Sequence, residues 1–155
     1  MSEKYNNKSA LRSPPHITLH MPFEYKTEKE SALFTALENF SFTDKFNVQL
    51  NNYACFEPKV VFIDVVQNDT LSLLQSTLVQ HIKVNLNIFN QAEALRGFHP
   101  HITIAFRDLK RSTFYEMMGE YKEKMYAANF NVDSFFLLKH TGKNWLPYKE
   151  FKFKV

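Results

Sequence analysis

A five-residue segment occurs twice in this chain and constrains the fold more than any other feature. Pro15-His16-Ile17-Thr18-Leu19 returns as Pro100-His101-Ile102-Thr103-Ile104, with four of the five positions identical. Both copies alternate polar and apolar residues, which is typical of a half-buried β-strand. Such a repeat is rare by chance within one chain. We therefore expect two related lobes, each of which contributes one motif strand to a shared cleft.

The spacing of histidine and threonine places both side chains of a copy on one face of its strand. Residues two apart in a strand point the same way and lie about 6.6–6.8 Å apart. The apolar residues between them then face the core: Ile17, Leu19, Ile102 and Ile104. Two such strands facing one another would present two imidazoles and two hydroxyls around one small space.

That set of side chains suits phosphoryl chemistry. An imidazole has an ordinary pKa of about 6.5, so near neutral pH one histidine can accept a proton while the other donates one. A threonine hydroxyl can donate a hydrogen bond to a phosphate oxygen on which negative charge gathers. Such a mechanism needs no metal ion and no other cofactor. It predicts a bell-shaped dependence of activity on pH.

Length and composition narrow the class of protein. A chain of 155 residues is expected to form a single domain over 1–155. The one cysteine, Cys55, excludes an internal disulfide and a cysteine-based metal cluster, which favours a reducing compartment. We find neither a signal peptide nor an apolar run of about 18 residues, so we predict a cytoplasmic protein with no membrane partner. A net charge of +3 permits an anionic ligand but argues against a long RNA footprint.

The pattern along the chain predicts alternating groups of strands and helices. We expect strands over 16–21, 46–50 (continuing over 53–56 after a kink at Asn51-Asn52), 60–66 and 98–106. Helices are predicted over 27–40, with Thr27 as the cap, over 69–89 and over 112–127. Residues 130–140 and 145–155 are predicted to form a hairpin that turns at 141–144. This order indicates an α+β fold in which helices cover the outer faces of antiparallel or mixed sheets.

A histidine-based metal site is the main alternative for the repeated motif. His99-Pro100-His101 supplies two imidazoles at a spacing that metal sites use, but no third ligand is obvious nearby. His16 and His20 lie about 13 Å apart on a regular strand, which is too far to share one ion. We expect His20 and His99 to have supporting or structural roles. His81 and His140 are expected at the surface.

Arg107 is a candidate phosphate ligand on geometric grounds. On a regular strand it shares a face with His101 and Thr103, and a guanidinium can hold a phosphate through two hydrogen bonds. A solvated arginine at the end of a strand is the alternative interpretation.

The two H-x-T-x motifs resemble those of the two-histidine (2H) phosphoesterase superfamily, in particular its 2′-5′ RNA ligase-like and cyclic phosphodiesterase group. Three further runs resemble the same group: Leu11-Arg12-Ser13-Pro14-Pro15, Phe56-Glu57-Pro58-Lys59-Val60-Val61-Phe62 and Phe98-His99-Pro100. The resemblance implies a bilobal, pseudo-twofold α+β fold whose cleft binds a phosphodiester or a 2′,3′-cyclic phosphate. It also implies that a nucleotide cyclic phosphate or an RNA end is the partner.

The resemblance assigns roles to individual residues. His16 and His101 carry over as the acid–base pair, and Thr18 and Thr103 as donors to phosphate oxygens. The family pattern also suggests Tyr53 and Lys59 as substrate-binding residues, in addition to Arg107. Many relatives have their arginine one residue earlier, where this chain has Phe106.

A second departure concerns the beginning of the chain. Family members usually have a strand and a helix before the first motif, whereas fifteen residues precede His16 here. We expect the lobe to lack that strand and helix. The exposed sheet edge that results would favour a homodimer.

Two other functions fit the same residues. One is a non-catalytic module that binds nucleotides or RNA ends in the cleft. The other is a metal-dependent hydrolase built on His99 and His101.

Overall fold

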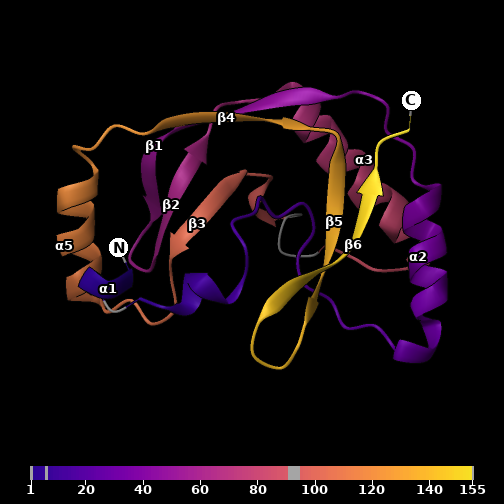
Figure 1. Cartoon of the computed structure of the whole chain (residues 1–155), viewed down its shortest axis with the longest axis horizontal. Helices are drawn as coiled ribbons and strands as arrows, with labels where there is room; N and C mark the ends of the chain where they lie inside the picture. Colours follow the sequence, from indigo (N-terminus) through magenta and orange to yellow (C-terminus); the bar gives the residue numbers. More distant parts are fainter. Residues whose placement is uncertain (1, 6, 91–94, 155) are drawn as a thin grey trace.

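Two antiparallel sheets on opposite halves of the molecule form its frame (Figure 1). The computed structural model describes residues 2–5, 7–90 and 95–154. One sheet has the strand order β3-β2-β1-β4, and the other pairs β5 with β6. Their bounds are β1 (Phe46–Phe56), β2 (Val60–Val65), β3 (His101–Ala105), β4 (Ala127–Val132), β5 (Ser134–His140) and β6 (Trp145–Lys152). Every pairing between these strands is antiparallel, so the expected α+β class is confirmed with antiparallel sheets.

The kink predicted within the long strand β1 is confirmed. The pairing of β1 with β2 shifts between Leu50 and Tyr53, and Asn52 has a φ of 58°. The Asn52 N–H donates to the Tyr126 carbonyl at 2.7 Å, and its side-chain oxygen accepts from the Tyr126 N–H at 2.9 Å. Asparagine tolerates this left-handed conformation better than most residues do. The kink therefore bends β1 without leaving its backbone unpaired.

The prediction of one strand over 130–140 is wrong. The chain leaves the four-stranded sheet after Val132 and enters the second sheet at Ser134. At the break, the Asp133 carbonyl accepts a hydrogen bond from the Phe153 N–H at 2.8 Å. Across the break the alternating apolar residues at 130 and 132 give way to an unbroken apolar run at 135–138, so the phase of the alternation changes there. The hairpin turn at 141–144 is confirmed, with Thr141 N–H bonded to the Asn144 carbonyl at 2.8 Å.

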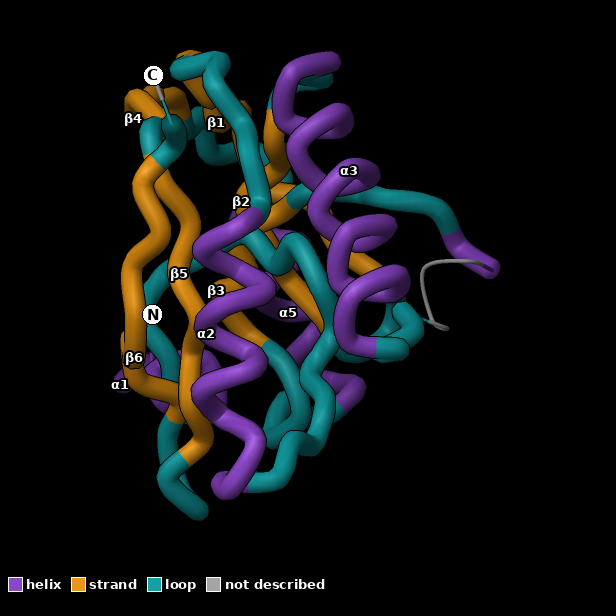
Figure 2. Tube along the Cα trace, turned by 90° about the vertical axis from the view of Figure 1, so that its right-hand side faces the viewer, coloured by secondary structure: helices purple, strands orange, loops and turns teal. Residues whose placement is uncertain are grey.

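Three longer helices cover the outer sides of the sheets, close to the predicted ranges. They are α2 (Glu30–Asn39), α3 (Asp69–Leu86) and α5 (Arg111–Tyr121); short helical turns occur as α1 (Ser2–Tyr5), η1 (Ser9–Arg12) and η2 (Thr27–Lys29). Figure 2 shows α2 and α3 side by side over the half that carries β5 and β6. Thr27 does not cap α2, because Lys29 occupies the N-cap position without a side-chain bond. Asn68 caps α3 by accepting from the Leu71 N–H at 2.9 Å. None of the helices that the structure describes is long and apolar enough to cross a membrane.

Three groups of buried side chains hold these layers together. An aromatic-rich group joins α2 and α3 to the β5–β6 hairpin. A second group packs α5 on the four-stranded sheet, with Phe114 and Met117 fully buried. The third group lies between β1, β2 and the start of α3, and Ile17 and Ile102 pack against it. Many of the buried aromatic side chains are thus concentrated around the two-stranded sheet of β5 and β6.

The strand predicted over 16–21 is wrong. In this segment only Ile17 pairs with a strand, through an isolated antiparallel bridge to Ile102. After Leu19, whose carbonyl accepts from the Gln75 side chain at 3.3 Å, the chain bends away. His20 then turns its Nδ1 to the Met21 carbonyl at 2.7 Å. In this segment these two hydrogen bonds take the place of backbone pairing with a neighbouring strand.

The strand β4 forms one edge of the four-stranded sheet. Homodimerisation through an exposed sheet edge stays a prediction.

We expect Leu74→Ala to lower the free energy of unfolding by about 2–5 kcal/mol, because it removes a buried side chain and leaves a cavity. Leu74 is only 1% exposed, whereas its neighbour Leu73 on the same helix is 49% exposed. Leu73→Ala is therefore the matched control, with an expected change of about 0.5 kcal/mol or less. Urea unfolding of both variants checks the prediction. Equal losses would contradict the assignment of this face of α3 to the core.

Candidate active site

The two copies of the repeated motif lie side by side. Ile17 of the first copy pairs with Ile102 of the second in an antiparallel bridge. An antiparallel register through this bridge sets His16 opposite Thr103 and Thr18 opposite His101. Directly opposed residues in such a pair have Cβ atoms about 4.5–5.5 Å apart, and diagonal neighbours lie about 7–8 Å apart. In this register the hydroxyl of each copy lies beside the imidazole of the other copy, and His16 and His101 are diagonal neighbours across the pair.

Both histidines are anchored in the same way. Nδ1 of His16 lies 2.7 Å from the carbonyl oxygen of Pro14, and Nδ1 of His101 lies 2.7 Å from that of His99. A carbonyl only accepts, so each Nδ1 must carry a hydrogen and donate it. The neutral ring then has its lone pair on Nε2. Neither Nε2 is hydrogen-bonded to any residue that the structure describes, so both are free to exchange a proton.

His101 lies in an aromatic environment at the beginning of β3. The centroid of its ring is 4.8 Å from that of Phe62 and 5.1 Å from that of Phe56. Burial lowers the pKa of His101 below its ordinary value, because the charged imidazolium loses water. The nearby imidazoles of His99 and His16 lower this pKa further, while the hydrogen bond to the His99 carbonyl and the charge of Asp64 oppose the shift.

The first-copy residues are more accessible. His16 is exposed, and Thr18 is half-buried like Thr103. The charge of His16 acts on the pKa of His101, which places the two rings within electrostatic reach of one another. The pair is therefore asymmetric, with one imidazole enclosed and the other open to solvent.

Tyr53 lies on the opposite face of the sheet, so the suggestion that it binds substrate is not supported by its position. It belongs to a row of paired residues across the strands, made by Ile17, Ile102, Ile63 and Tyr53. Paired residues share a face, and residues next to them in the strand point to the other face. The Tyr53 ring packs edge-on against Tyr121 of α5 at 4.9 Å, and burial raises its pKa. Tyr53 packs against the apolar core beneath α5.

The alternation that was expected to place Arg107 on the face of His101 is interrupted. The pairing of β3 with β2 shifts between Thr103 and Ala105, and the strand ends at Ala105. Arg107 follows in a left-handed turn with a φ of 59°. Its guanidinium lies 5.2 Å from the Phe106 ring centroid, and its side chain is exposed. A role in phosphate binding stays a prediction.

Lys59 is exposed in the turn between β1 and β2, where its N–H donates to the Phe56 carbonyl at 3.2 Å. The turn thus sets Lys59 close in sequence and space to Phe56, one of the rings around His101. Its role in substrate binding also stays a prediction.

Three residues near His101 were not identified from the sequence. Asp64 pairs directly with His101 across β2 and β3, and Phe56 and Phe62 enclose its ring. The sequence contains one signal for Asp64, which is the only charged residue in the β-branched and aromatic run of β2. A charge in an otherwise apolar strand is a candidate for a functional role. The phenylalanines carry no such signal in a chain with sixteen of them.

Metal ligation was the alternative for His99 and His101. No three histidine, cysteine or carboxylate side chains come together as a metal-binding group among the described residues. Nε2 of His99 instead lies 3.3 Å from Oδ1 of Asp64.

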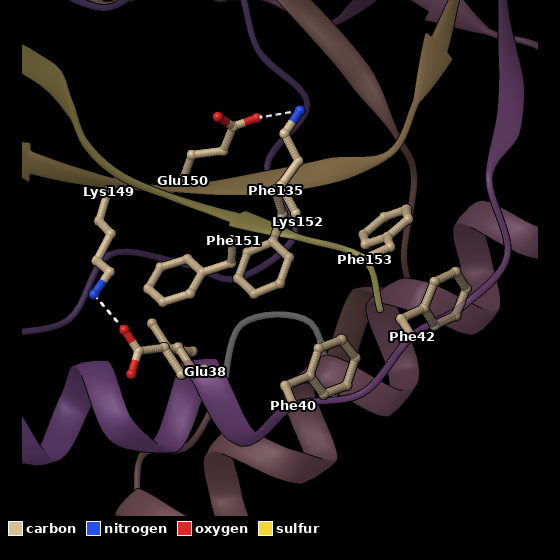
Figure 3. Close-up of a pocket in the computed structure, with 10 residues that line it drawn as sticks. Glu38, Phe40, Phe42, Phe135, Lys149, Glu150, Phe151, Lys152 and Phe153 are labelled. Carbon is tan, nitrogen blue, oxygen red and sulfur yellow. Dashed lines mark hydrogen bonds and ion pairs between the residues drawn. The ribbon is translucent and has the colours of Figure 1, made fainter. Parts of the chain in front are cut away.

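A separate pocket of about 160 Å³ lies between the end of α2 and β6 (Figure 3). Phenylalanines line it, and two ion pairs border it: Lys149–Glu38 at 2.5 Å and Lys152–Glu150 at 2.9 Å. None of the residues in the two motifs lines this pocket. It lacks an imidazole, so it does not offer the acid–base chemistry of the motif pair.

We expect Phe56→Ala to raise the pKa of His101 toward its ordinary value of about 6.5, since water then reaches the ring and stabilises its charged form. Histidine Cε1–H resonances followed by NMR through a pH titration measure this shift. Phe130→Ala is the control, because Phe130 in β4 is 40% exposed and Phe56 is 41% exposed. An unchanged His101 pKa in Phe56→Ala would show that the aromatic ring does not cause the desolvation.

Comparisons with known proteins show the family to which the chain belongs. The family model described as "2′-5′ RNA ligase superfamily" matches residues 2–144. Among curated proteins, a "Putative phosphoesterase" of Geobacillus sp. (strain WCH70) is 29% identical over 96% of this chain and 83% of its own length. A protein with the same description from Oceanobacillus iheyensis is 28% identical over 97% of this chain and 86% of its own.

Solved structures share the fold. The apo form of E. coli LigT superposes with a TM-score of 0.63 at 21% identity, covering 91% of this chain and 77% of that one. The crystal structure of a protein described as a phosphoesterase gives a TM-score of 0.62 at 20% identity, covering 99% of this chain and 88% of that one. With the family model spanning both H-x-T motifs, the chain belongs to the 2′-5′ RNA ligase superfamily.

Proposed function

We propose that this protein is a metal-independent phosphoesterase that opens nucleoside 2′,3′-cyclic phosphates, or acts on 2′-5′ RNA linkages, by acid–base catalysis with His16 and His101. The observation that carries the proposal is the shared anchoring of the two histidines. Each donates Nδ1–H to the carbonyl two residues before it, at 2.7 Å. This leaves the two Nε2 atoms as the proton-exchanging positions on either side of one space.

The asymmetry of the two rings suggests which histidine acts as the base in hydrolysis. Burial lowers the pKa of His101, so its ring is neutral at pH 7 and able to accept a proton. The exposed ring of His16 then serves as the acid. In ligation an RNA hydroxyl takes the place of water and the two histidines keep these roles; the roles exchange in the reverse direction, which re-forms the cyclic phosphate.

His16 and His101 account for both proton transfers in the hydrolysis. Nε2 of His101 takes a proton from water, and the water oxygen forms a bond to phosphorus. The bond from phosphorus to one ribose oxygen breaks, and Nε2–H of His16 protonates that oxygen, giving a nucleoside phosphomonoester. Thr18 and Thr103 donate hydrogen bonds to the non-bridging oxygens, where charge increases in the transition state. Lys59 and Arg107 are further cations for the anionic substrate.

The relatives support a nucleotide as the substrate class. E. coli LigT has been crystallised in complex with 3′-AMP and with ATP. The modest net charge of +3 suits a short nucleotide or an RNA end better than a long RNA.

The purified protein is expected to hydrolyse a nucleoside 2′,3′-cyclic phosphate in the presence of EDTA. His16→Ala and His101→Ala should each lower kcat by about 10²–10⁴, and the double variant should lose little more, because the two residues act as a unit. His140→Ala is the control with full activity, because His140 is an exposed histidine at the end of β5. Full activity in both single variants would refute the assignment. Nucleotide binding without turnover would favour the non-catalytic binding module, and loss of turnover on chelation would favour the metal hydrolase.

Thr18→Val and Thr103→Val test the hydroxyls, since valine keeps the shape of the side chain without the donor. We expect each to lower kcat by about 10²–10³, as for the loss of one donor to a developing oxyanion. Thr35→Val is the control, because the hydroxyl of Thr35 bonds the Ser31 carbonyl within α2 at 2.9 Å. Steady-state kinetics with the cyclic phosphate measure the effect. A change in KM alone would mean that the hydroxyls bind substrate and transition state equally.

A further inference from the structure

A carboxylate lies beside the place where an anionic substrate must bind. Asp64 of β2 is the direct cross-strand partner of His101 of β3. Its side chain is 42% exposed, and its charge acts on the pKa of His101. A phosphate held between His16 and His101 would therefore experience the negative charge of Asp64 from one side.

His99 covers this carboxylate. Its Nε2 lies 3.3 Å from Oδ1 of Asp64, and the same oxygen accepts the Val65 N–H at 3.0 Å. The carboxylate oxygen cannot donate, so Nε2 of His99 carries the hydrogen. In its protonated form, His99 forms an ion pair with Asp64.

Aromatic contacts hold the His99 ring in this place. Its centroid lies 5.3 Å from that of Phe56 and 5.6 Å from that of Phe62, both in edge-to-face geometry. The same two phenylalanines enclose His101, whose centroid is 6.2 Å from that of His99. The two imidazoles thus share one aromatic wall, and only one of them bonds to the carboxylate.

We propose that His99 is a positioning residue that holds the Asp64 carboxylate through a hydrogen bond and so permits the site to bind a phosphate group. The hydrogen bond replaces a bare, mobile carboxylate next to His101 with a fixed one. The titratable groups around His101 of β3 are Asp64 from β2, His99, and His16 from the first motif. Each of them acts on the pKa of His101. This inference rests on the proposed function, since it requires that the anion binds between His16 and His101.

The test is the affinity for inorganic phosphate, followed through the NMR signals of His16 and His101. His99→Ala leaves the Asp64 carboxylate without its hydrogen bond and should weaken phosphate binding by about three- to tenfold, as expected for a charge that repels the phosphate through largely aqueous surroundings. His99→Ala combined with Asp64→Asn should bind phosphate at least as tightly as the unaltered protein. A purely structural role of His99 would not be rescued by removing its partner.

The controls separate charge from folding. Glu38→Gln removes one negative charge from α2, on the other half of the molecule (Figure 1), and should leave phosphate affinity unchanged. His99→Gln keeps a hydrogen-bond donor to Asp64 and should retain the phosphate affinity that His99→Ala loses, whereas a loss equal to that of His99→Ala would overturn the inference. In steady-state kinetics, His99→Ala should raise KM with kcat nearly constant.

Two negative outcomes are distinguishable. If phosphate perturbs neither His16 nor His101 in the unaltered protein, the proposed function fails, and this inference fails with it. If the unaltered protein binds phosphate there but His99→Ala binds it equally well, or the double variant is no better than His99→Ala, this inference alone is overturned.

Discussion

The antiparallel bridge between Ile17 and Ile102 is the contact on which the candidate site depends. It joins a segment that has almost no regular strand structure to the edge of the four-stranded sheet. Both isoleucines pack against the same buried group, so apolar burial holds the bridge where a longer ladder does not. Because neighbouring residues in an extended segment point to opposite faces, burying these two side chains turns His16 and His101 outward together.

The arrangement around the two histidines combines symmetry with asymmetry. The backbone anchors both histidines through the same bond, since each Nδ1 donates to a carbonyl two residues earlier. The side-chain surroundings differ, because Phe56 and Phe62 enclose the ring of His101, whereas the ring of His16 is exposed. The shared anchoring fixes which nitrogen exchanges a proton, and the different burial biases which ring is neutral. One repeated motif can thereby supply both an acid and a base.

The errors of sequence-based interpretation have a common physical origin. The alternation in 16–21 suggested a full strand, but hydrogen bonds of Leu19 and His20 to other partners end the pairing after one residue. The single strand predicted over 130–140 ran across a change of phase at Asp133-Ser134, where the chain passes from one sheet to the other. Alternation records which side chains are buried, whereas strand pairing depends on the backbone partners available.

Arg107 and Tyr53 show the same limit for individual residues. A shift in the pairing of β3 with β2 and a left-handed turn separate Arg107 from the regular face of His101. Tyr53 matched a family pattern but lies in the row of Ile17 and Ile102, on the face that packs beneath α5. A one-residue irregularity reverses the face of every residue that follows, and no local pattern reveals it.

The sequence by itself determined the repeated motif, the chemistry of its imidazoles and hydroxyls, and most of the elements, because these follow from local composition and period. Only the tertiary structure decided that Ile17 pairs with Ile102, that phenylalanines enclose one histidine, and that Asp64 and His99 pair beside it. These relations join residues from separate strands. They depend on register between strands, which is set by the packing of the whole sheet rather than by any single segment.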